Sequence, residues 1–443
     1  MTNLLVRRRR ESDRQAGSSR RKWAFKACAT RQENEVTDLK DMIPNANAAE
    51  LALAATYGAL PQDSRRTRAF EAFAASGLPH RRMEAWKWSD FKAGLPQLDA
   101  PRTQAEQDPF ADFDAPVITI SGGRITLPEV LPDGVKLHEQ ADPQAFAGAE
   151  DMPLGALTAA LAGHGGGIAT LLIEVTAAVE TPLRLVCASQ GAESSFSRVV
   201  FVVRPGASLD VYESHLGGAG FSGHLVDIGL QDGARFGRTI YQAAGTDQVQ
   251  AVTGDVHLNG GARYVQTMLA FGARVSRLET RLTHHREGGE AVLNAAYLAG
   301  PGQHVDVTTH VRHSAVSCST RQMTKGAVRD GGKGVFQGKF HVPRTVGQNT
   351  DAAMEHHALL LENGAEVFAK PELEIYADDV ECAHGNTCGA LDPVQLFYMR
   401  QRGIPDAEAR GLLTSAFIAE ALEQAPPAGY DALTELAERW LQR

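Results

Sequence analysis

Beyond Pro116, short runs of alternating apolar and polar residues predict β-strands, separated by turns rich in Gly, Asp and Asn. Successive side chains of a strand point to opposite faces, so this period of two is typical of strands that bury one face. Helical periodicity is almost absent until Leu391. Six strands stand out, at residues 170–175, 183–188, 199–203, 208–212, 225–230 and 235–241.

A glycine-centred turn recurs through this β region at nearly constant spacing. Its glycines are 27, 28 and 28 residues apart, and a predicted strand follows each of them: Gly206, Gly233, Gly261 and Gly289. The Asn363-Gly364 turn repeats the pattern later. Two strands per repeat and no helix between them predict stacked coils, as in a right-handed parallel β-helix or a related β-solenoid. A β-sandwich is the alternative, but it predicts hairpins rather than a corner at a fixed period.

Helical patterns precede the β region. An alanine-rich stretch at 46–76 has apolar residues at i,i+4 spacing and predicts two helices that end before Pro79. Residues 81–90 mix charge with two tryptophans, and we expect an amphipathic helix whose indole rings pack on the next domain. A linker rich in Pro and Asp is expected at 92–115.

Three helices are predicted after Leu391. Asp392 with Pro393 suits the start of the first, which runs to about Gly403, and Pro405 starts the second. The last helix carries one apolar stripe that must bury against its own chain or against another protein. The stripe consists of Tyr430, Leu433, Ala437 and Trp440.

These patterns divide the chain into four segments: 1–41, 42–115, 116–390 and 391–443. They are a basic leader, an N-terminal helical region with linker, a β-helix core and a C-terminal helical region. The leader is rich in Arg, Ser and Gln, and we expect it to be disordered. We favour upstream sequence read through from an early start codon, with Met42 as an alternative start. An organelle presequence or a nucleic-acid arm remains an alternative.

Composition and charge narrow the function classes. The formal charge is -9, and the first 31 residues contribute about +8, so the remainder is near -17 and is a poor nucleic-acid binder. No run approaches the roughly 18 apolar residues of a membrane-spanning helix, and no secretory signal follows the N-terminal arginines. Five cysteines, odd in number and far apart, are typical of free thiols in a reducing compartment, which predicts a cytoplasmic protein.

One short stretch holds the candidate chemistry. Cys382 and His384 follow a predicted strand and are two residues apart, so they share a face if the strand continues. Thiolate and imidazole bind zinc, iron and iron–sulfur clusters. With Cys388, however, the spacing is not that of a closed four-ligand site. Two interpretations remain: a small buried thiol beside a polar corner residue, or a half-site that another subunit completes.

The sequence gives less support to a nucleotide site or to a carbohydrate-active enzyme. The glycine-rich stretch 331–339 has a lysine where a phosphate-binding loop needs its first glycine, and Phe340 stands where Ser or Thr must bind magnesium, so no nucleotide site is predicted. Asp378 and Asp379 could serve a β-helix enzyme that acts on carbohydrates through surface acids. That enzyme is the rival hypothesis, although the β region lacks an obvious aromatic sugar platform.

Two motifs resemble those of a known family. The segments KPELEIYADDV at 370–380, CAHG at 382–385 and QLFYMRQRGI at 395–404 closely resemble the C-terminal signature of the SufB/SufD family of iron–sulfur cluster assembly proteins. The segment GLPHRRMEAWKWSD at 77–90 is similar to the N-terminal motif of the SufD branch. The resemblance extends from about residue 46 to the C-terminus.

The resemblance implies a non-catalytic scaffold with a β-helix core. Its expected partners are a SufB subunit, which pairs through the β-helix, and the ABC-type ATPase SufC, which docks on the C-terminal helices. A nascent iron–sulfur cluster would form at the SufB interface, with His384 and Cys382 as contributors and His384 as a metal ligand shared with the partner. Reduced flavin is associated with such complexes. The candidate docking residues for the ATPase are Leu396, Phe397, Arg400, Leu413 and Phe417.

Overall fold

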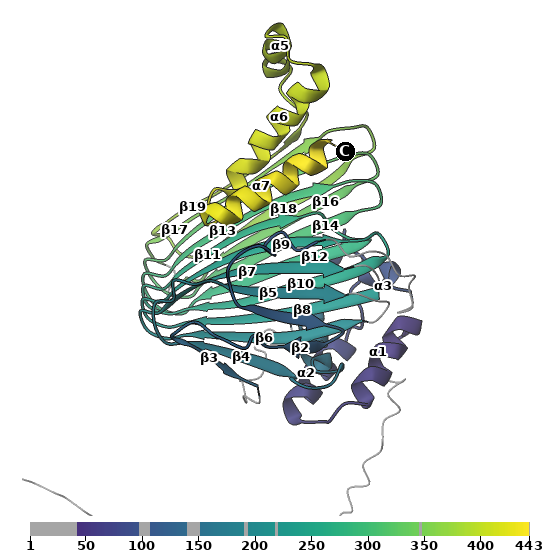
Figure 1. The fold of residues 1–443 in the computed structure, drawn as a ribbon, viewed down its shortest axis with the longest axis vertical. Coiled ribbons are helices and arrows are strands. Elements are labelled where there is room, and N and C mark those ends of the chain that lie inside the picture. The colour runs from purple at the N-terminus through teal and green to yellow at the C-terminus, as the bar shows by residue number, and fades with distance from the viewer. Residues whose placement is uncertain are drawn as a thin grey trace, which may run out of the picture. The chain divides into compact units, whose positions relative to one another are not determined.

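Two long parallel sheets form the centre of the molecule (Figure 1). The computed structural model describes residues 42–96, 107–139, 151–189, 194–217, 220–344 and 348–442, all in a unit that spans 38–443. From β4 onward, successive strands alternate between the sheets, so each strand pairs with the strand two places later. This arrangement confirms the predicted β-solenoid. It excludes the sandwich, because the ladders are parallel except at the N-terminal end.

The strands of each sheet stack in register. Sheet A contains β1 (Val117–Ser121), β2 (Arg124–Thr126), β5 (Leu183–Ser189), β7 (Ser208–Gly217), β9 (Arg235–Ala244), β11 (Arg263–Ala270), β13 (Glu290–Ala299), β15 (Ser319–Val328), β17 (Thr350–Leu360) and β19 (Val380–Gly389). Sheet B contains β3 (Val135–His138), β4 (Thr170–Val175), β6 (Ser195–Val203), β8 (Gly220–Leu230), β10 (Gln248–Leu258), β12 (Val275–His284), β14 (His304–His313), β16 (Lys333–Val342) and β18 (Glu366–Ile375). All six strands predicted from the alternation are present, and most of them are longer than predicted.

The predicted glycine corner joins a sheet B strand to the next sheet A strand at four places, from β6 to β7 and on to the corner between β12 and β13. Its glycines have positive φ, as a tight corner requires, at Gly206 (69°), Gly233 (69°) and Gly261 (62°). In the fourth turn the positive φ falls on Gly288 (75°), so the prediction of Gly289 was wrong by one residue. Gly364 (φ 90°) makes the same kind of turn at the opposite corner, between β17 and β18.

The inward face of β7 is apolar in its first part and polar further along. On β7 the first inward residues, Leu209 and Val211, belong to the apolar core, whereas Glu213 and His215 further along the same face are polar and fully buried. The Arg238 guanidinium pairs with Glu213 at 2.7 Å. At β7 the interior therefore has an apolar part and a polar part, and burial obliges the polar groups to find partners inside the protein.

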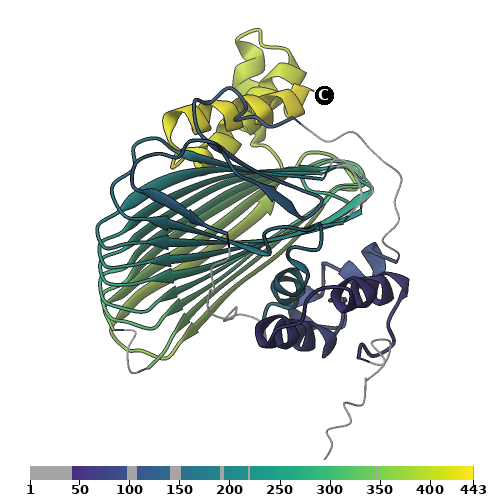
Figure 2. The same cartoon turned by 60° about the horizontal axis from the view of Figure 1, so that its bottom comes forward.

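Helices α1 (Ala48–Gly58), α2 (Ser64–Ala74), α3 (Phe91–Gly94) and α4 (Pro153–Leu161) pack on the sheet B side (Figure 2). The two helices expected within 46–76 are confirmed. Helix α4 was not predicted and lies within the segment assigned to the β-helix. Almost all of its residues are buried, so the sequence shows no amphipathic stripe there.

The tryptophan motif is not the amphipathic helix that we expected. Only a single turn, η2 (Glu84–Trp86), forms, and both indole rings pack on sheet B. The Arg277 guanidinium lies 3.8 Å from the Trp86 ring centre, and Trp88 stacks on Phe368 at 5.8 Å. Side chains two apart on a helix face nearly opposite directions, so a helix could not place both rings on one sheet. The predicted packing of the tryptophans on the β domain is confirmed.

The C-terminal helices are α5 (Pro393–Gln401), α6 (Asp406–Ala419) and α7 (Pro427–Gln442), with the short η3 (Glu420–Leu422) between the last two. The stripe of α7 buries against its own chain. Leu433 and Ala437 are covered by the outer face of sheet A, and Trp440 lies under the Arg329 guanidinium at 4.3 Å. Helices α6 and α7 thus cover sheet A, on the side away from the N-terminal helices (Figure 2).

Three further predictions can be compared with the described residues. The cysteines there, Cys187, Cys318, Cys382 and Cys388, are free thiols as predicted. Within the described ranges, no helix has both the length and the apolar character that crossing a membrane requires. The basic leader at 1–41, with Cys28, lies outside the described residues, as does 97–106 of the predicted linker.

Candidate functional site

Both sheets end on an exposed strand at the C-terminal end of the solenoid. Within the described residues, β18 pairs only with β16 and β19 only with β17, and each edge strand has ten residues. Pro371 lies inside β18, which suits an edge position because proline has no N–H to donate to a neighbouring strand. The outer edges of both strands therefore present backbone donors and acceptors without strand partners.

The candidate residues of β19 continue the interior face of the coil before it. Cys382 lies beside Ala352 of β17, His384 beside Met354, and Cys388 beside Ala358. These three β17 residues are buried inside the solenoid. Cys382 is half-buried against the core, whereas His384 and Cys388 are exposed because no further coil covers them. As the alternation predicted, Cys382 and His384 share one face.

The spacing along β19 places Cys382 and His384 close together and Cys388 far from Cys382. At about 3.3 Å per residue, the Cα atoms of Cys382 and His384 are roughly 7 Å apart, and those of Cys382 and Cys388 roughly 20 Å. Cys388 therefore cannot bind one ion together with Cys382. Among the described residues, the β19 side chains do not form a cluster of three close metal ligands. Cys382 and His384 are at most half of a metal site.

Burial changes the pKa values of the two thiols on β19. It raises the pKa of Cys382, an effect that the nearby Ala352 backbone partly offsets, and it raises the pKa of Cys388. Both groups are therefore thiols at neutral pH in the isolated chain. A metal ion or a positive partner group would have to displace the proton before either sulfur could bind as thiolate.

A buried histidine links the edge to the interior. His356 Nδ1 lies 2.7 Å from Asn386 Oδ1 on β19, and His356 Nε2 lies 2.9 Å from the Tyr297 hydroxyl. Burial lowers the pKa of His356 to about 4, so the ring is neutral and holds the proton that it donates to Asn386. Neither His356 nor Asn386 was assigned a role from the sequence. The alternation itself contained the signal, because Asn386 has the same parity as Cys382 and His384.

The predicted docking residues differ in exposure. Phe397 and Arg400 are exposed on α5, and Leu396 is buried beneath them. Leu413 is half-buried on α6, and Phe417 packs on sheet A with Lys325 Nζ 4.5 Å from its ring centre. Further exposed apolar residues of these helices were not predicted: Val394, Tyr398 and Leu412.

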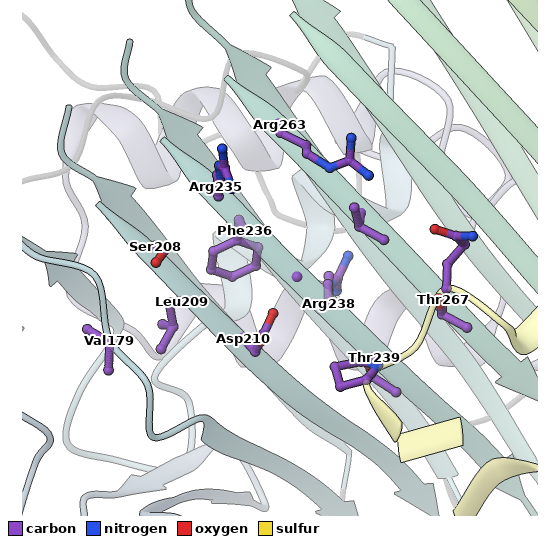
Figure 3. A pocket seen from close by; sticks show the side chains of 14 residues that line it. Val179, Ser208, Leu209, Asp210, Arg235, Phe236, Arg238, Thr239, Arg263 and Thr267 are labelled. Atoms are coloured by element: carbon purple, nitrogen blue, oxygen red, sulfur yellow. The ribbon is translucent and has the colours of Figure 1, made fainter. Parts of the chain in front are cut away.

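A pocket of about 370 Å³ opens on sheet A beneath Gln424 and Pro426 (Figure 3). Its lining includes Asp210, Arg235 and Arg263, and Arg263 pairs with Glu290 at 2.7 Å. Neither Cys nor His lines it, and its strands lie far from β19 in the order of the sheet. The acids of the rival hypothesis, Asp378 and Asp379, are exposed in the turn before β19.

Comparison with known proteins places this arrangement in a family. A family model described as "SUF system FeS cluster assembly, SufBD core domain" matches residues 186–417, which is more than half of the chain. The chain belongs to the SufBD family. The matched segment runs from β5 into α6 and includes β18 and β19, so the exposed edge is part of the SufBD core domain.

Individual relatives agree with this assignment. The chain is 38% identical to the iron–sulfur cluster assembly protein SufD of Escherichia coli over 34% of its length, and 25% identical to SufD of Bacillus subtilis over 68%. It is 31% identical to a SufBD family protein of Synechocystis over 46%. The matched segments cover 36%, 66% and 45% of these relatives, which is less than two-thirds of each.

Proposed function

We propose that this chain is a non-catalytic scaffold subunit of a SufB–SufC–SufD complex that assembles iron–sulfur clusters for transfer to other proteins. The observation that carries the proposal is the exposed last coil, where β18 and β19 end both sheets and leave Cys382 and His384 at the open end of the core. Membership in the SufBD family supports the same role.

The open end favours a partner with the same architecture. A solenoid needs a cap or a neighbour at each end, because its last coil otherwise exposes core side chains. Here the C-terminal helices contact β11, β13 and β15 rather than cover β18 and β19. Leu373 and Cys382 lie against the core and remain partly exposed. A SufB solenoid would extend both sheets by strand addition and would cover these side chains.

Such an interface would complete the metal site. Cys382 and His384 supply a thiol and an imidazole about 7 Å apart along one strand, which is too few ligands for an iron–sulfur cluster. The remaining ligands would come from SufB. We assign His384 the larger role, because its side chain is exposed, whereas Cys382 is half-buried against the core. The nascent cluster is then a cargo held between subunits, not a resident cofactor of this chain.

The ATPase SufC would dock on α5 and α6. Val394, Phe397 and Tyr398 are 72%, 62% and 58% exposed, although they are large apolar or aromatic residues on one short helix. Contiguous exposed apolar surface of this kind is typical of a protein contact. At the other end of α6, Lys325 on β15 pairs with Glu420. ATP hydrolysis in SufC would move the helices and, through such contacts, shift sheet A toward its open edge.

ATP binding and the reduced flavin are assigned to other parts of the complex. ATP binds to SufC, since the glycine-rich stretch 331–339 forms a corner and the start of β16. Reduced flavin belongs to the complex, and we assign it no site on this chain. We place the complex in the cytoplasm, where the free thiols Cys187, Cys318, Cys382 and Cys388 stay reduced.

Co-expression with SufB and SufC followed by affinity purification tests the proposal. The unchanged chain should bring down both partners and support cluster formation, measured by visible absorption and iron and sulfide content. His384→Ala should keep both partners and lose most of the cluster. Phe397→Ala with Tyr398→Ala should release SufC and retain SufB.

Val130→Ala is the matched control, because Val130 is 74% exposed and lies far from both surfaces along the chain. It should change neither partner binding nor cluster content. Full cluster formation by the His384→Ala complex would contradict the role of His384. Purification of the chain without either partner would contradict the scaffold role itself.

A further inference from the structure

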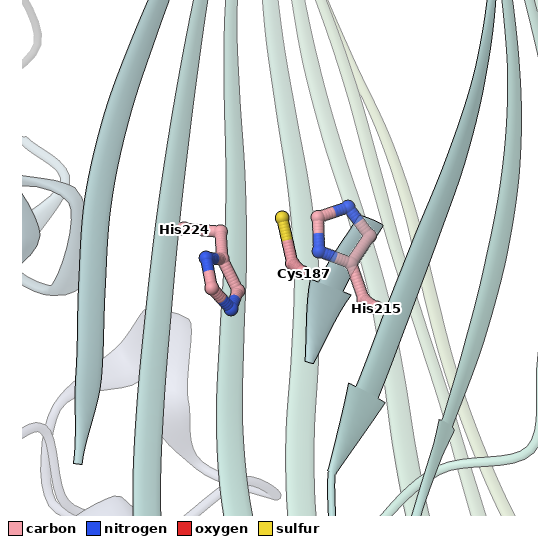
Figure 4. Close-up of side chains that lie close together, drawn as sticks. All are labelled: Cys187, His215 and His224. Atoms are coloured by element: carbon pink, nitrogen blue, oxygen red, sulfur yellow. The ribbon is translucent and has the colours of Figure 1, made fainter. Parts of the chain in front are cut away.

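A second group of Cys and His side chains lies inside the solenoid, remote from the β19 edge. Cys187 on β5, His215 on β7 and His224 on β8 point toward one another between the sheets (Figure 4). One ligand atom from each residue lies within 4.8 Å of the others. All three side chains are buried, with exposures of 1%, 0% and 2%.

The strand register brings these residues together from distant parts of the sequence. Cys187 and His215 are direct neighbours in the ladder between β5 and β7. His224 lies on sheet B, on the same face of β8 as the core residues Val226 and Ile228, so it faces the other two across the interior. His215 lies near the end of β7, and His224 lies in the first half of β8.

The hydrogen bonds of His215 orient one nitrogen toward the centre. Its Nε2 donates to Glu213 Oε2 at 3.0 Å, and Arg238 holds that carboxylate from the other side. The other nitrogen, Nδ1, has no hydrogen-bond partner among the described residues, although the ring is fully buried. A metal-binding histidine typically donates its second N–H to a carboxylate in this way.

His224 has a matching arrangement. Its Nδ1 lies 2.8 Å from the Ser197 hydroxyl, which leaves Nε2 available to an ion. The two imidazole rings are 5.3 Å apart. The buried His215 Nδ1 without a partner calls for an explanation such as an ion, because such atoms are rare in folded proteins.

We propose that Cys187, His215 and His224 bind one divalent metal ion of the borderline class, with Zn²⁺ as the expected ion. Cys and His are the ligands that zinc prefers, at about 2.3 Å for sulfur and about 2.1 Å for nitrogen. These bond lengths place tetrahedral ligand atoms about 3.5 Å apart, so small side-chain rotations close the present set. The thiol proton passes to solvent on binding, and water takes the fourth position.

This site goes beyond the proposed function. It uses none of the β19 residues, needs no partner subunit, and stays intact whether or not the chain acts in cluster assembly. Its three protein ligands leave one position open, which is typical of a site that exchanges a ligand rather than of a closed structural site.

Cobalt titration of the full chain tests the site. The background carries Cys28→Ser, Cys382→Ser and Cys388→Ser, so that Cys187 and Cys318 are the remaining thiols. After chelator treatment and without oxygen, Co²⁺ should bind at one equivalent, with a thiolate-to-cobalt charge-transfer band and the visible bands of tetrahedral cobalt. Zn²⁺ should displace it, and Fe²⁺ in place of Zn²⁺ should displace it less completely.

The ligand variant and its control separate this site from other thiols. Cys187→Ser in the same background should abolish the charge-transfer band and weaken Co²⁺ binding at least tenfold. Cys318→Ser, the matched control, removes another buried thiol and should leave both unchanged. Circular dichroism checks that each variant is folded.

A second measurement keeps the test decisive if Cys187→Ser does not fold. X-ray absorption at the zinc edge of the background protein should show one sulfur and two or three nitrogen or oxygen neighbours. Absence of stoichiometric binding, a site with no sulfur neighbour, or a charge-transfer band that persists in Cys187→Ser would each overturn the proposal. None of these results bears on partner binding or on His384.

Discussion

The solenoid holds cysteine and histidine on its inner face at two places, and their surroundings differ. In the early coils, Cys187, His215 and His224 are enclosed by both sheets. In the last coil, Cys382 and His384 occupy equivalent inward positions on β19, but no further coil covers them. The same residue types therefore form a three-ligand group in one place and an incomplete pair in the other.

The difference shows that the strands around a Cys or His side chain, more than the residue type, determine whether it can bind a metal ion within one chain. The buried group gains ligands from two sheets and a carboxylate that orients one ring. The edge pair has neighbours on one side only, so it is suited to share a ligand with another subunit. Three predictions test this difference, in decreasing order of the stability change expected for a single residue.

Glu213→Gln should destabilise the enclosed coil most. It removes the charge opposite Arg238, which is buried and would be left without a counter-charge, so we expect a loss of about 3–5 kcal/mol in the free energy of unfolding. Urea denaturation of the metal-free chain measures this loss. Glu290→Gln is the matched control, because it breaks an exposed pair with Arg263 on the same sheet and should cost about 0–1 kcal/mol. Equal losses in the two variants would contradict the enclosed character of the early coils.

Acid should weaken the enclosed interior through its neutral histidines. Burial lowers the pKa of His304, His313 and His356 from 6.5 to about 4. Between these values the unfolded chain binds protons that the folded chain does not, so the free energy of unfolding falls as the pH drops from 6.5 to 4. Each histidine accounts for about 3 kcal/mol of this loss.

Urea denaturation from pH 7 to pH 4 measures that slope. His356→Gln keeps a polar side chain at the position and removes one titrating group, so its slope should be shallower than that of the unchanged chain. An identical slope would show that His356 is not held neutral beneath the edge strand.

Replacing single sulfur atoms should give the smallest effects and compare the two places directly. Cys187→Ser puts a hydroxyl into a fully buried position, and we expect a loss of about 1–3 kcal/mol in the metal-free chain. Cys382→Ser changes a half-buried residue at the open end and should cost less than about 1 kcal/mol. Thermal unfolding of both variants measures the difference. A larger loss for Cys382→Ser would mean that the last coil is as enclosed as the early ones.

Much of the fold could be predicted because it depends on local periodicity. Alternation located strands such as β4, which begins and ends where predicted, and the spacing of Gly206, Gly233 and Gly261 revealed the coils. Helix α4 was missed because it is buried on nearly all sides, so it has no polar face to show a helical period. The turn at Trp86 was assigned as a helix, because the Arg277 and Phe368 contacts that fix it come from strands far along the chain.

The candidate site could be predicted in part for the same reason. Cys382 and His384 are neighbours along one strand, so alternation alone places them on a shared face. Cys187 and His215 are 28 residues apart, which matches the repeat of the coils, but His224 comes from the other sheet, so no pattern within one strand indicates that the three residues meet. Exposure on the proposed docking surface could not be predicted either, since Leu396 and Phe397 are adjacent in sequence but only Phe397 is exposed.

The stacked strands, the helical ends and the pair Cys382 and His384 could thus be predicted, because each is a regularity within a short segment of sequence. Which coil is enclosed and which is open became apparent from the packing of the strands alone. That distinction depends on which strands lie on either side of a residue, and the parallel ladders bring those strands from 26 or more residues away. The enclosed coils therefore hold three potential ligands together, whereas the open β19 edge holds two and needs a partner subunit.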